Sequence, residues 1–191
     1  MAARIVTALE RPDLAERADQ ATDGAFPEYN KHGDVLGPRW SRLYEEYPAD
    51  QLVLWDDATG EVLGEGNSIP CRFDRTVQGL PRGIDEVIAT GLPEVGVPPE
   101  PTALCALAIA VPPGQENRGQ SRLLLAGMRA LAAGRGWTSL IAPVRPSWKA
   151  RYPLTPIQRY AGWTRPDGLP FDPWLRVHAR LGGRILRAER E

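Results

Sequence analysis

The sequence has few of the residues that build metal sites and disulfide frameworks. It contains two cysteines and two histidines in 191 residues, and they show no spacing typical of a metal site. Cys71 and Cys105 both lie in apolar stretches, so we expect buried thiols rather than a disulfide. These shortages argue against a disulfide-stapled scaffold and against a metalloenzyme.

Long hydrophobic runs and an apolar leader are also missing. No apolar stretch approaches the roughly 20 residues needed to span a bilayer, and the start, Met-Ala-Ala-Arg-Ile-Val-Thr, has no apolar signal region. Hydrophobic residues make up 42% of the chain and charged residues 25%, which is typical of a globular protein. We therefore expect one cytoplasmic domain over residues 1–191 without membrane contact.

Neither sign of charge dominates the whole chain, but the two halves differ. The net charge is −1, whereas residues 1–100 carry 9 basic and 19 acidic side chains and residues 101–191 carry 14 and 5. A basic second half suits an anionic ligand, although the two halves could equally attract each other across the fold. Basic residues do not cluster with interleaved aromatic residues, so a nucleic-acid partner is not expected.

The stretch from residue 103 to residue 135 combines an apolar strand, a polar turn and a helix. Residues 103–111 are apolar throughout, which predicts a central strand covered on both faces. The helix predicted at 118–135 begins on a turn that contains Gly119. Its first backbone N–H groups have no partners within the helix, and with the helix dipole they form an anion site. We expect this turn to hold the pyrophosphate of a nucleotide-type cofactor.

The rest of the chain alternates between strand and helix patterns. The segment 146–170 is rich in Pro, Trp, Tyr and Arg, and connections of that length are usually functional or carry structure of their own. Asp172 is the expected N-cap of the last helix. Strands are predicted at 4–9, 52–55, 62–69, 137–144 and 184–187, and helices at 12–21, 40–47, 83–91, 156–160 and 174–181.

The turn resembles motif A of the GNAT superfamily of N-acetyltransferases, which reads Gln/Arg-x-x-Gly-x-Gly/Ala and opens a helix. Gly119 matches the first glycine, Glu116 stands where Gln or Arg is usual, and Ser121 replaces the second small residue. The order of the predicted elements is also that of GNAT proteins over nearly the whole chain. The resemblance implies an α/β (α+β) fold. Its central sheet would be mixed, mostly antiparallel and splayed at the cofactor strand, with helices on both faces.

The resemblance implies transfer of an acetyl group from acetyl-CoA to a primary amine of a small molecule. Backbone groups of Ile109, Ala110 and Val111 would pair with the pantetheine arm, and Ser147 is a further expected cofactor contact. Backbone N–H groups of the turn would bind the pyrophosphate, and two arginines could add charge-assisted contacts. The residues expected around the pyrophosphate are Glu116, Asn117, Arg118, Gly119, Gln120, Ser121 and Arg122.

A second match to the family lies in the last helix. GNAT proteins often place a Tyr four residues before a Gly there, and His178 takes that position ahead of Gly182. His178 is therefore the expected general acid, because the pKa of histidine lies near working pH. Tyr152 and Tyr160 are alternative acids. His178 could instead simply pack beside Trp174.

The general base and the acceptor site are less clearly marked. No carboxylate lies on the central strand, where many GNAT proteins keep a base. Glu65 on the predicted hairpin is a candidate, although a solvated carboxylate is the more common outcome on such a strand. Gly64 and Gly66 beside it suggest a bulge or a close backbone approach. The residues expected to contact the acceptor are Phe26, Tyr29, Asn67 and Trp148, of which Phe26 and Tyr29 could equally pack on the core.

Segments 66–70 and 142–148 also resemble uncharacterised actinobacterial-type GNAT proteins, without pointing to a substrate. A GNAT-like module that binds CoA or a partner without turnover is the main alternative function. A dinucleotide-binding protein is less well supported, since Gly119 is not part of a Gly-x-Gly-x-x-Gly motif. Too few residues follow residue 187 for the further strand that GNAT folds usually carry. That strand could be absent, replaced by 146–170, or supplied by a second copy in a homodimer.

Overall fold

The structure is a computed structural model that describes residues 3–26 and 36–189, apart from the side chain of Leu36. Contacts within the chain divide it into two compact units, residues 1–142 and residues 143–191. They are called the N-terminal unit and the C-terminal unit below. The expectation of one acyltransferase domain over the whole chain stays a prediction.

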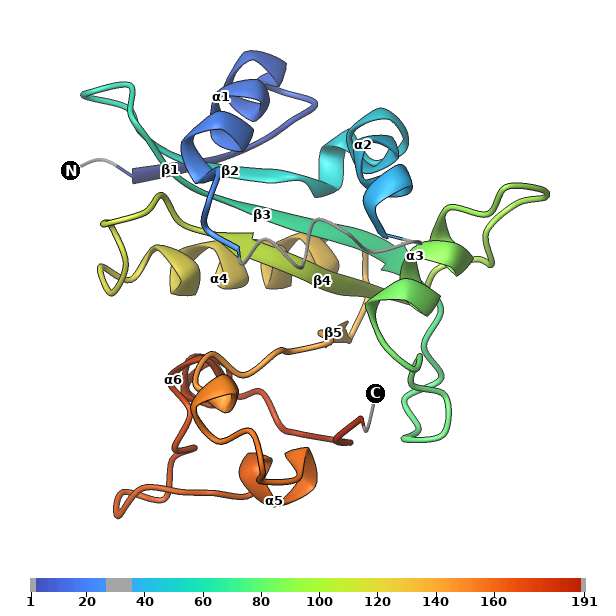
Figure 1. The fold of residues 1–191 in the computed structure, drawn as a ribbon. Helices are drawn as coiled ribbons and strands as arrows, with labels where there is room; N and C mark the ends of the chain where they lie inside the picture. Colours follow the sequence, from blue (N-terminus) through green and yellow to red (C-terminus); the bar gives the residue numbers. More distant parts are fainter. Residues whose placement is uncertain (1–2, 27–35, 190–191) are drawn as a thin grey trace. The chain divides into compact units, whose positions relative to one another are not determined.

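A five-stranded sheet forms the centre of the N-terminal unit (Figure 1). Adjacent strands from β1 to β4 are antiparallel, while β4 and β5 are parallel. This mixed, mostly antiparallel sheet is the one expected from the sequence. In spatial order the strands are β1 (Ala3–Thr7), β2 (Leu52–Asp56), β3 (Val62–Cys71), β4 (Ala103–Ala110) and β5 (Leu140–Ile141).

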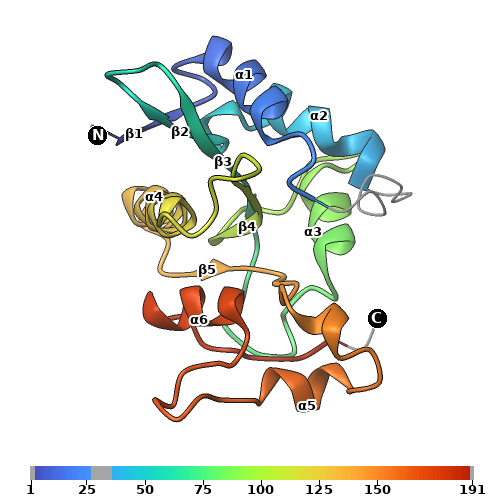
Figure 2. The same cartoon turned by 60° about the vertical axis from the view of Figure 1, so that its left-hand side comes forward.

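Helices cover both faces of the sheet (Figures 1 and 2). On one face, side chains of the first three helices join strand residues in two apolar clusters, one of which contains Leu43, Ile88 and Cys105. The fourth helix covers the opposite face. The helices of this unit are α1 (Pro12–Thr22), α2 (Leu36–Glu46), the short η2 (Pro48–Asp50), α3 (Ile84–Gly91) and α4 (Gln120–Gly134).

Two glycines let α4 lie directly on β3. A Cβ atom at Gly64 would come within 2.8 Å of the Ala110 carbonyl oxygen, and one at Gly66 within 2.7 Å of the Met128 methyl group. Real Cβ atoms do not approach other atoms so closely, so a larger residue at Gly64 would push the neighbouring strand away, whereas the end of the Met128 side chain could move aside for one at Gly66. The close backbone approach expected in this segment is therefore confirmed at Gly64.

The C-terminal unit is held together by aromatic side chains. Its helices are η3 (Lys149–Arg151), α5 (Ile157–Ala161) and α6 (Pro173–Arg180). Ring centroids in the cluster lie 5.0–6.3 Å apart, in tilted or edge-to-face pairs that favour aromatic contacts. The four clustered residues are Tyr152, Tyr160, Trp163 and Phe171.

Three of the predicted elements differ from the structure by more than two residues at one end or do not form. The strand predicted at 137–144 pairs only at Leu140 and Ile141, because Pro143 has no N–H group with which to continue the ladder. The strand predicted at 184–187 does not form, and Ile185 and Leu186 there are half exposed. The helix predicted at 40–47 begins four residues earlier, at Leu36.

Candidate active site

The last part of β4 separates from its neighbour β5. The two strands pair only through Leu104 and Cys105 of β4, so residues 106–110 have no partner strand on that side among the described residues. On its other side β4 stays paired with β3 up to Ala110, with Leu107 as an extra, bulged residue. Ile109 and Ala110 therefore border an unpaired strand edge, as expected for a splayed cofactor strand.

The loop from residue 111 to residue 119 leads from that edge directly into α4. Asn117 and Gly119 have left-handed backbone conformations, with φ of 65° and 90°, and Gly119 is the N-cap of the helix. A Cβ atom at Gly119 would meet no other atom within 4 Å. The space beside the start of α4 is thus open, and the N–H groups of its first turn stay available to a ligand.

The loop is braced by its own polar groups. The Gln120 side chain is buried, and its Nε2 atom donates to the carbonyl oxygen of Gln115 at 3.1 Å. The Glu116 carboxylate accepts a hydrogen bond from the Gly114 N–H at 3.1 Å. Backbone N–H groups of Glu116 and Gly114, followed by the charge of Arg118, lower the pKa of Glu116. The loop therefore carries one anionic side chain of its own.

The residues expected around the pyrophosphate thus share one short segment at the start of α4. Arg118, Gly119 and Arg122 are exposed there, as are Glu116 and Asn117. Ser121 is half-buried, and Gln120 turns its side chain to the loop. Two guanidinium groups beside free N–H groups suit an anion, whereas Glu116 opposes one.

A buried carboxylate lies on β3 opposite the end of β4. Glu65 pairs in register with Ala110 and is only 8% exposed. Its two oxygens accept hydrogen bonds from the Thr22 hydroxyl of α1 at 2.7 Å and from the Tyr44 hydroxyl of α2 at 3.1 Å. The sequence favoured a solvated carboxylate at this position. That expectation is wrong, because α1 and α2 cover this part of the strand.

The surroundings of Glu65 favour its protonated form. Burial raises the pKa of Glu65, the hydroxyls of Thr22 and Tyr44 lower it part of the way, and the charge of Asp19 raises it again. Burial and the Glu65 charge also raise the pKa of Tyr44 above its usual range. Glu65 forms no ion pair with any described cation. A carboxyl group whose pKa is raised by burial is a candidate for proton exchange with a ligand.

Asn67 extends this hydrogen-bonded network. Its side chain is 2% exposed, and Nδ2 donates to the Tyr44 hydroxyl at 2.7 Å and to Oε1 of Gln51 at 3.4 Å. Phe26, by contrast, is exposed at the end of the first described stretch, and Tyr29 lies outside the described residues. Contact of these side chains with an acceptor stays a prediction.

Ser147, Trp148 and Tyr152 belong to the C-terminal unit. The backbone N–H groups of Ser147 and Trp148 donate to the Asp172 carboxylate at 3.2 and 2.8 Å. The Trp148 ring meets Phe171 edge to face at 5.7 Å, and Tyr152 lies in the aromatic cluster around the same phenylalanine. These contacts explain their positions without a ligand, and their predicted roles stay untested.

His178 lies on α6 and packs against Trp174, with ring centroids 4.6 Å apart. Its Nε2 atom is buried and has no hydrogen-bond partner in the described chain. Burial lowers the pKa of His178, so the imidazole is neutral at pH 7. A neutral imidazole has one N–H proton to donate, and the predicted role of His178 as general acid stays a prediction.

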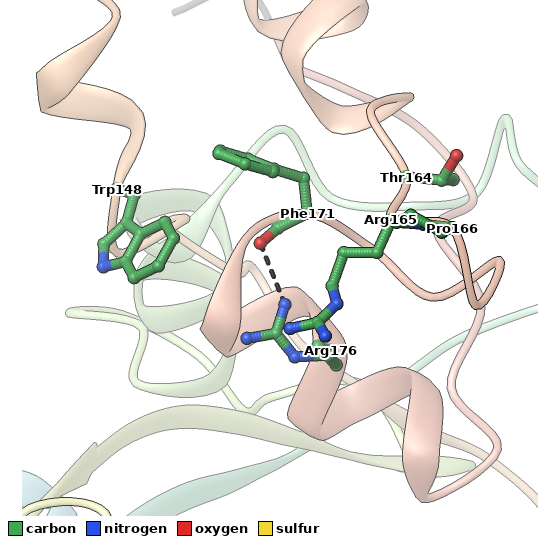
Figure 3. Close-up of a pocket in the computed structure, with 6 residues that line it drawn as sticks. All are labelled: Trp148, Thr164, Arg165, Pro166, Phe171 and Arg176. Atoms are coloured by element: carbon green, nitrogen blue, oxygen red, sulfur yellow. Dashed lines mark hydrogen bonds between the residues drawn. The ribbon is translucent and has the colours of Figure 1, made fainter.

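Two features of the C-terminal unit were not found from the sequence. Asp172 was predicted only as an N-cap, which its bonds from the N–H groups of Trp174 and Leu175 confirm. It accepts three further hydrogen bonds, two from the chain around residue 147 and one from the Tyr160 hydroxyl at 2.8 Å. The second feature is a cavity of about 320 Å³ (Figure 3). Both depend on loop contacts that leave no sequence pattern.

The described residues were also compared with what a disulfide, a metal site or a membrane-spanning helix would need. Cys71 and Cys105 are free thiols, and burial raises the pKa of Cys71 to about 11. No group of three or more His, Cys, Asp or Glu side chains in residues 3–26 and 36–189 is arranged to hold a metal ion. Among the helices of the same residues, none has both the length and the apolar character to cross a membrane.

Comparison with known proteins gives one sequence relative and several similar structures. No protein-family model matches the chain. The arginine N-acetyltransferase avaD of Aspergillus versicolor is 28% identical over 200 residues, which cover 95% of this chain and 68% of that protein. The loading GNATL domain of CurA from Lyngbya majuscula superposes with a TM-score of 0.68 at 19% identity, covering 97% of this chain and 86% of that one.

A second solved structure, the GphF GNAT-like decarboxylase in complex with isobutyryl-CoA, superposes with a TM-score of 0.70 at 21% identity. The match covers 95% of this chain and 86% of that chain. The two superpositions establish the fold, and the splayed β4 with its glycine turn lies where the motif resemblance placed it. The chain thus has the fold of these two GNAT-like structures and is similar in sequence to an arginine N-acetyltransferase.

Proposed function

We propose that this protein transfers an acetyl group from acetyl-CoA to the primary amine of a small molecule. The observation that carries the proposal is the unpaired end of β4, which runs directly into the left-handed Gly119 turn and the open start of α4. An extended cofactor arm can pair with such a strand edge while its pyrophosphate reaches the helix N-terminus. The arginine N-acetyltransferase relative supports an amine acceptor.

The residues of the loop fit the pyrophosphate of CoA with one exception. The N–H groups of the first turn of α4 offer donors, and the exposed Arg118 and Arg122 supply positive charge. The exception is Glu116, whose carboxylate would repel a phosphate. Its side chain is exposed, so it can turn into solvent when a phosphate arrives at the Gly114 N–H that it now contacts.

The chain also offers a proton acceptor for the amine. Acetyl-CoA supplies the acetyl group as a thioester. An ammonium group must lose a proton before its nitrogen can attack, and we assign that proton to Glu65 on β3, opposite the end of β4. The hydroxyls of Thr22 and Tyr44 hold the carboxylate in place. His178 and Tyr152 are the proposed donors of the proton that the departing thiolate takes up.

A CoA-binding module without turnover is the second candidate. The observation that favours it is Glu116, an ionised side chain within the anion-binding turn, together with the departure of Ser121 from the glycine or alanine of the motif. Such a module would still bind CoA through α4. The two candidates therefore differ in thiol release and agree in cofactor binding.

The test is release of free CoA thiol over a panel of donors and acceptors. Acetyl-, propionyl- and isobutyryl-CoA would be combined with arginine, other small primary amines, an aminoglycoside and a tertiary amine as a control. The proposal predicts thiol release that depends on a primary amine, with acetyl-CoA as the best donor. Saturable CoA binding without release for any acceptor would contradict it and support the binding module.

Gly119→Val tests whether the cofactor site is placed correctly. A β-branched residue is strained at a φ of 90°, and its side chain would fill the space beside the first turn of α4. CoA affinity measured by calorimetry should fall at least tenfold. Gly96→Val is the matched control, because Gly96 has a φ of 92° and a Cβ there also meets nothing within 4 Å. Equal affinities for both variants would contradict the placement.

A further inference from the structure

We propose that the C-terminal unit contains a binding site for a small organic carboxylate, a class of ligand that the acetyl transfer proposed above does not include. The site is the cavity of about 320 Å³ shown in Figure 3, which is large enough for a compact ligand. It combines two guanidinium groups with two aromatic rings. Its lining residues are Trp148, Thr164, Arg165, Pro166, Phe171 and Arg176.

Arg176 supplies the fixed positive charge of the site. Its Nη1 atom donates to the carbonyl oxygens of Pro170 and Phe171, both at 2.9 Å, which orients the guanidinium plane. Figure 3 shows the bond to Phe171. A guanidinium has five N–H donors, and the Nη2 and Nε donors of Arg176 have no acceptor among the described residues. No described carboxylate pairs with this half-buried cation, so an anion from solution would complete its surroundings.

Arg165 brings a second positive charge to the same cavity. It lies on a tight turn in which its N–H donates to the Leu169 carbonyl at 2.8 Å and its own carbonyl accepts from Gly168 at 2.9 Å. From this turn its side chain extends toward Arg176 in Figure 3. Within the described residues its one ion pair, Nε to Asp167 at 3.5 Å, is a surface pair of little strength. Two cations that line one cavity repel each other unless an anion lies between them.

Two aromatic rings form an apolar part of the cavity lining. Trp148 and Phe171 meet edge to face, with ring centroids 5.7 Å apart. Arg151 lies over the indole ring of Trp148, with its guanidinium carbon 4.7 Å from the ring centroid. Aromatic rings beside guanidinium groups are suited to a ligand that carries its negative charge on a small apolar or aromatic body.

A single buried carboxylate holds the chain segments of Trp148 and Arg176 in place before a ligand binds. Asp172 accepts hydrogen bonds from the N–H of Trp148 on one wall and from the N–H of Leu175 in α6, the helix that carries Arg176. Asp172 is 1% exposed and also accepts from Tyr160. The cavity is thus prepared by the fold, so a ligand does not have to order it on binding.

The observations favour a carboxylate over a phosphate. The fork of Arg176 still has donors in one plane, which matches the two coplanar oxygens of a carboxylate. The aromatic wall would contact the body of an organic acid but has no counterpart on inorganic phosphate. Benzoate is therefore the probe, benzyl alcohol is its uncharged analogue, and inorganic phosphate is the anion without an apolar body.

The experiment is an NMR titration of the full chain, without acetyl-CoA, that follows the indole N–H signals. The signal of Trp148 is assigned with a Trp148→Phe variant. Benzoate should shift this signal saturably and bind at least tenfold more tightly than benzyl alcohol or phosphate. Because the readout is binding in the absence of cofactor, its outcome is independent of the proposed acetyl transfer.

Variants of three arginines test which positive charge benzoate binding requires. Arg176→Gln should weaken benzoate binding at least tenfold and Arg165→Gln several-fold, while Arg176→Lys keeps the charge and should lose less than Arg176→Gln. Arg180→Gln, on the exposed surface of the same helix, is the matched control and should not change affinity.

Four results would overturn the proposal: no saturable shift, equal binding of benzyl alcohol, tighter binding of phosphate than of benzoate, or the same loss in Arg180→Gln as in Arg176→Gln. Loss of binding in Arg165→Gln, whose exposed side chain is not needed for folding, guards against a folding defect in the Arg176 variants.

Discussion

Glu65 in the N-terminal unit and Asp172 in the C-terminal unit are both buried carboxylates, and the two have very different hydrogen-bond partners. Asp172 in the C-terminal unit accepts hydrogen bonds from four backbone N–H groups and the Tyr160 hydroxyl. Glu65 in the N-terminal unit accepts two, both from side-chain hydroxyls, which lie 43 and 21 residues before it in the sequence. Neither carboxylate has a cation as partner among the described residues.

The number of hydrogen bonds distinguishes the two carboxylates. Asp172 has a structural role, whereas Glu65 has acceptor positions left for a reaction. A carboxylate has about four acceptor positions, and Asp172 uses them to hold a loop and a helix together. Glu65 keeps acceptor capacity free, and burial raises the pKa of Glu65. A buried acid that is only partly satisfied costs stability, so its presence on β3, opposite the end of the proposed cofactor strand, is easier to explain by function than by folding.

The largest expected effect is on stability, from Asp172→Ala. Removing this carboxylate leaves four N–H groups and a buried hydroxyl without their acceptor, and the free energy of unfolding should fall by about 3 kcal/mol or more. Chemical denaturation followed by tryptophan fluorescence measures the loss. Asp167→Ala, at an exposed turn of the same unit, should cost less than about 1 kcal/mol. A similar, small loss of unfolding free energy in both variants would contradict the structural role of Asp172.

The next effect is on catalysis, from Glu65→Gln. An amide cannot accept the proton of the acceptor amine, so kcat/KM should fall about 100-fold or more. In the parent enzyme the activity should rise with pH until Glu65 is ionised, and the midpoint should lie above the usual range for glutamate because the pKa is raised. Glu61→Gln on the same hairpin is exposed and should leave the rate unchanged. Full activity in Glu65→Gln, with the same pH profile, would contradict the role of Glu65.

Glu65→Gln, which should lower activity, should increase the stability of the protein, and this effect should be smaller than the effect on activity. Because the pKa of Glu65 is raised in the folded state, the native protein holds a proton that the unfolded chain releases. The stability contribution of this group is therefore lost as pH rises from the unfolded pKa to the higher folded pKa. Glu65→Gln cannot ionise and should avoid that loss, so its melting temperature relative to the parent should rise between pH 4 and pH 8. A difference that stays constant with pH would contradict the raised pKa.

The smallest effect is expected from Glu116→Gln. Glu116 is an exposed anion within the proposed pyrophosphate site, and its removal should tighten CoA binding roughly twofold at low salt. The gain should shrink when salt is added, because the interaction between exposed charges is screened. Calorimetric titration at two ionic strengths measures both. Weaker binding of CoA by Glu116→Gln would show that this side chain supports the loop rather than opposing the ligand.

The elements that the sequence predicted well have strong local patterns. The apolar run of β4, the helical spacing in α4 and the turn at Gly119 each come from neighbouring residues, and the structure confirms all three. The strands predicted near the C-terminus depended on pairing with other segments. Pro143 ends one of them early, and the other contains only four residues with Ile185 and Leu186 left exposed.

The candidate site also has a part that local sequence patterns predict and a part that depends on distant segments. The cofactor turn is continuous in sequence, so its motif could be found there, whereas the environment of Glu65 depends on Thr22 and Tyr44, which lie 43 and 21 residues away along the chain. No local pattern predicts that two helices will cover this strand. For the same reason Asp172 could be predicted as a helix cap but not as the anchor of the Trp148 loop.

The measurement that tests the central claim most directly is a crystal structure of the protein with acetyl-CoA. We expect the pyrophosphate to accept hydrogen bonds from the N–H groups of Gly119, Gln120 and Ser121, and the pantetheine arm to pair with Ile109 and Ala110 at the unpaired edge of β4. A cofactor bound elsewhere on the chain, with the start of α4 still open to solvent, would contradict the account.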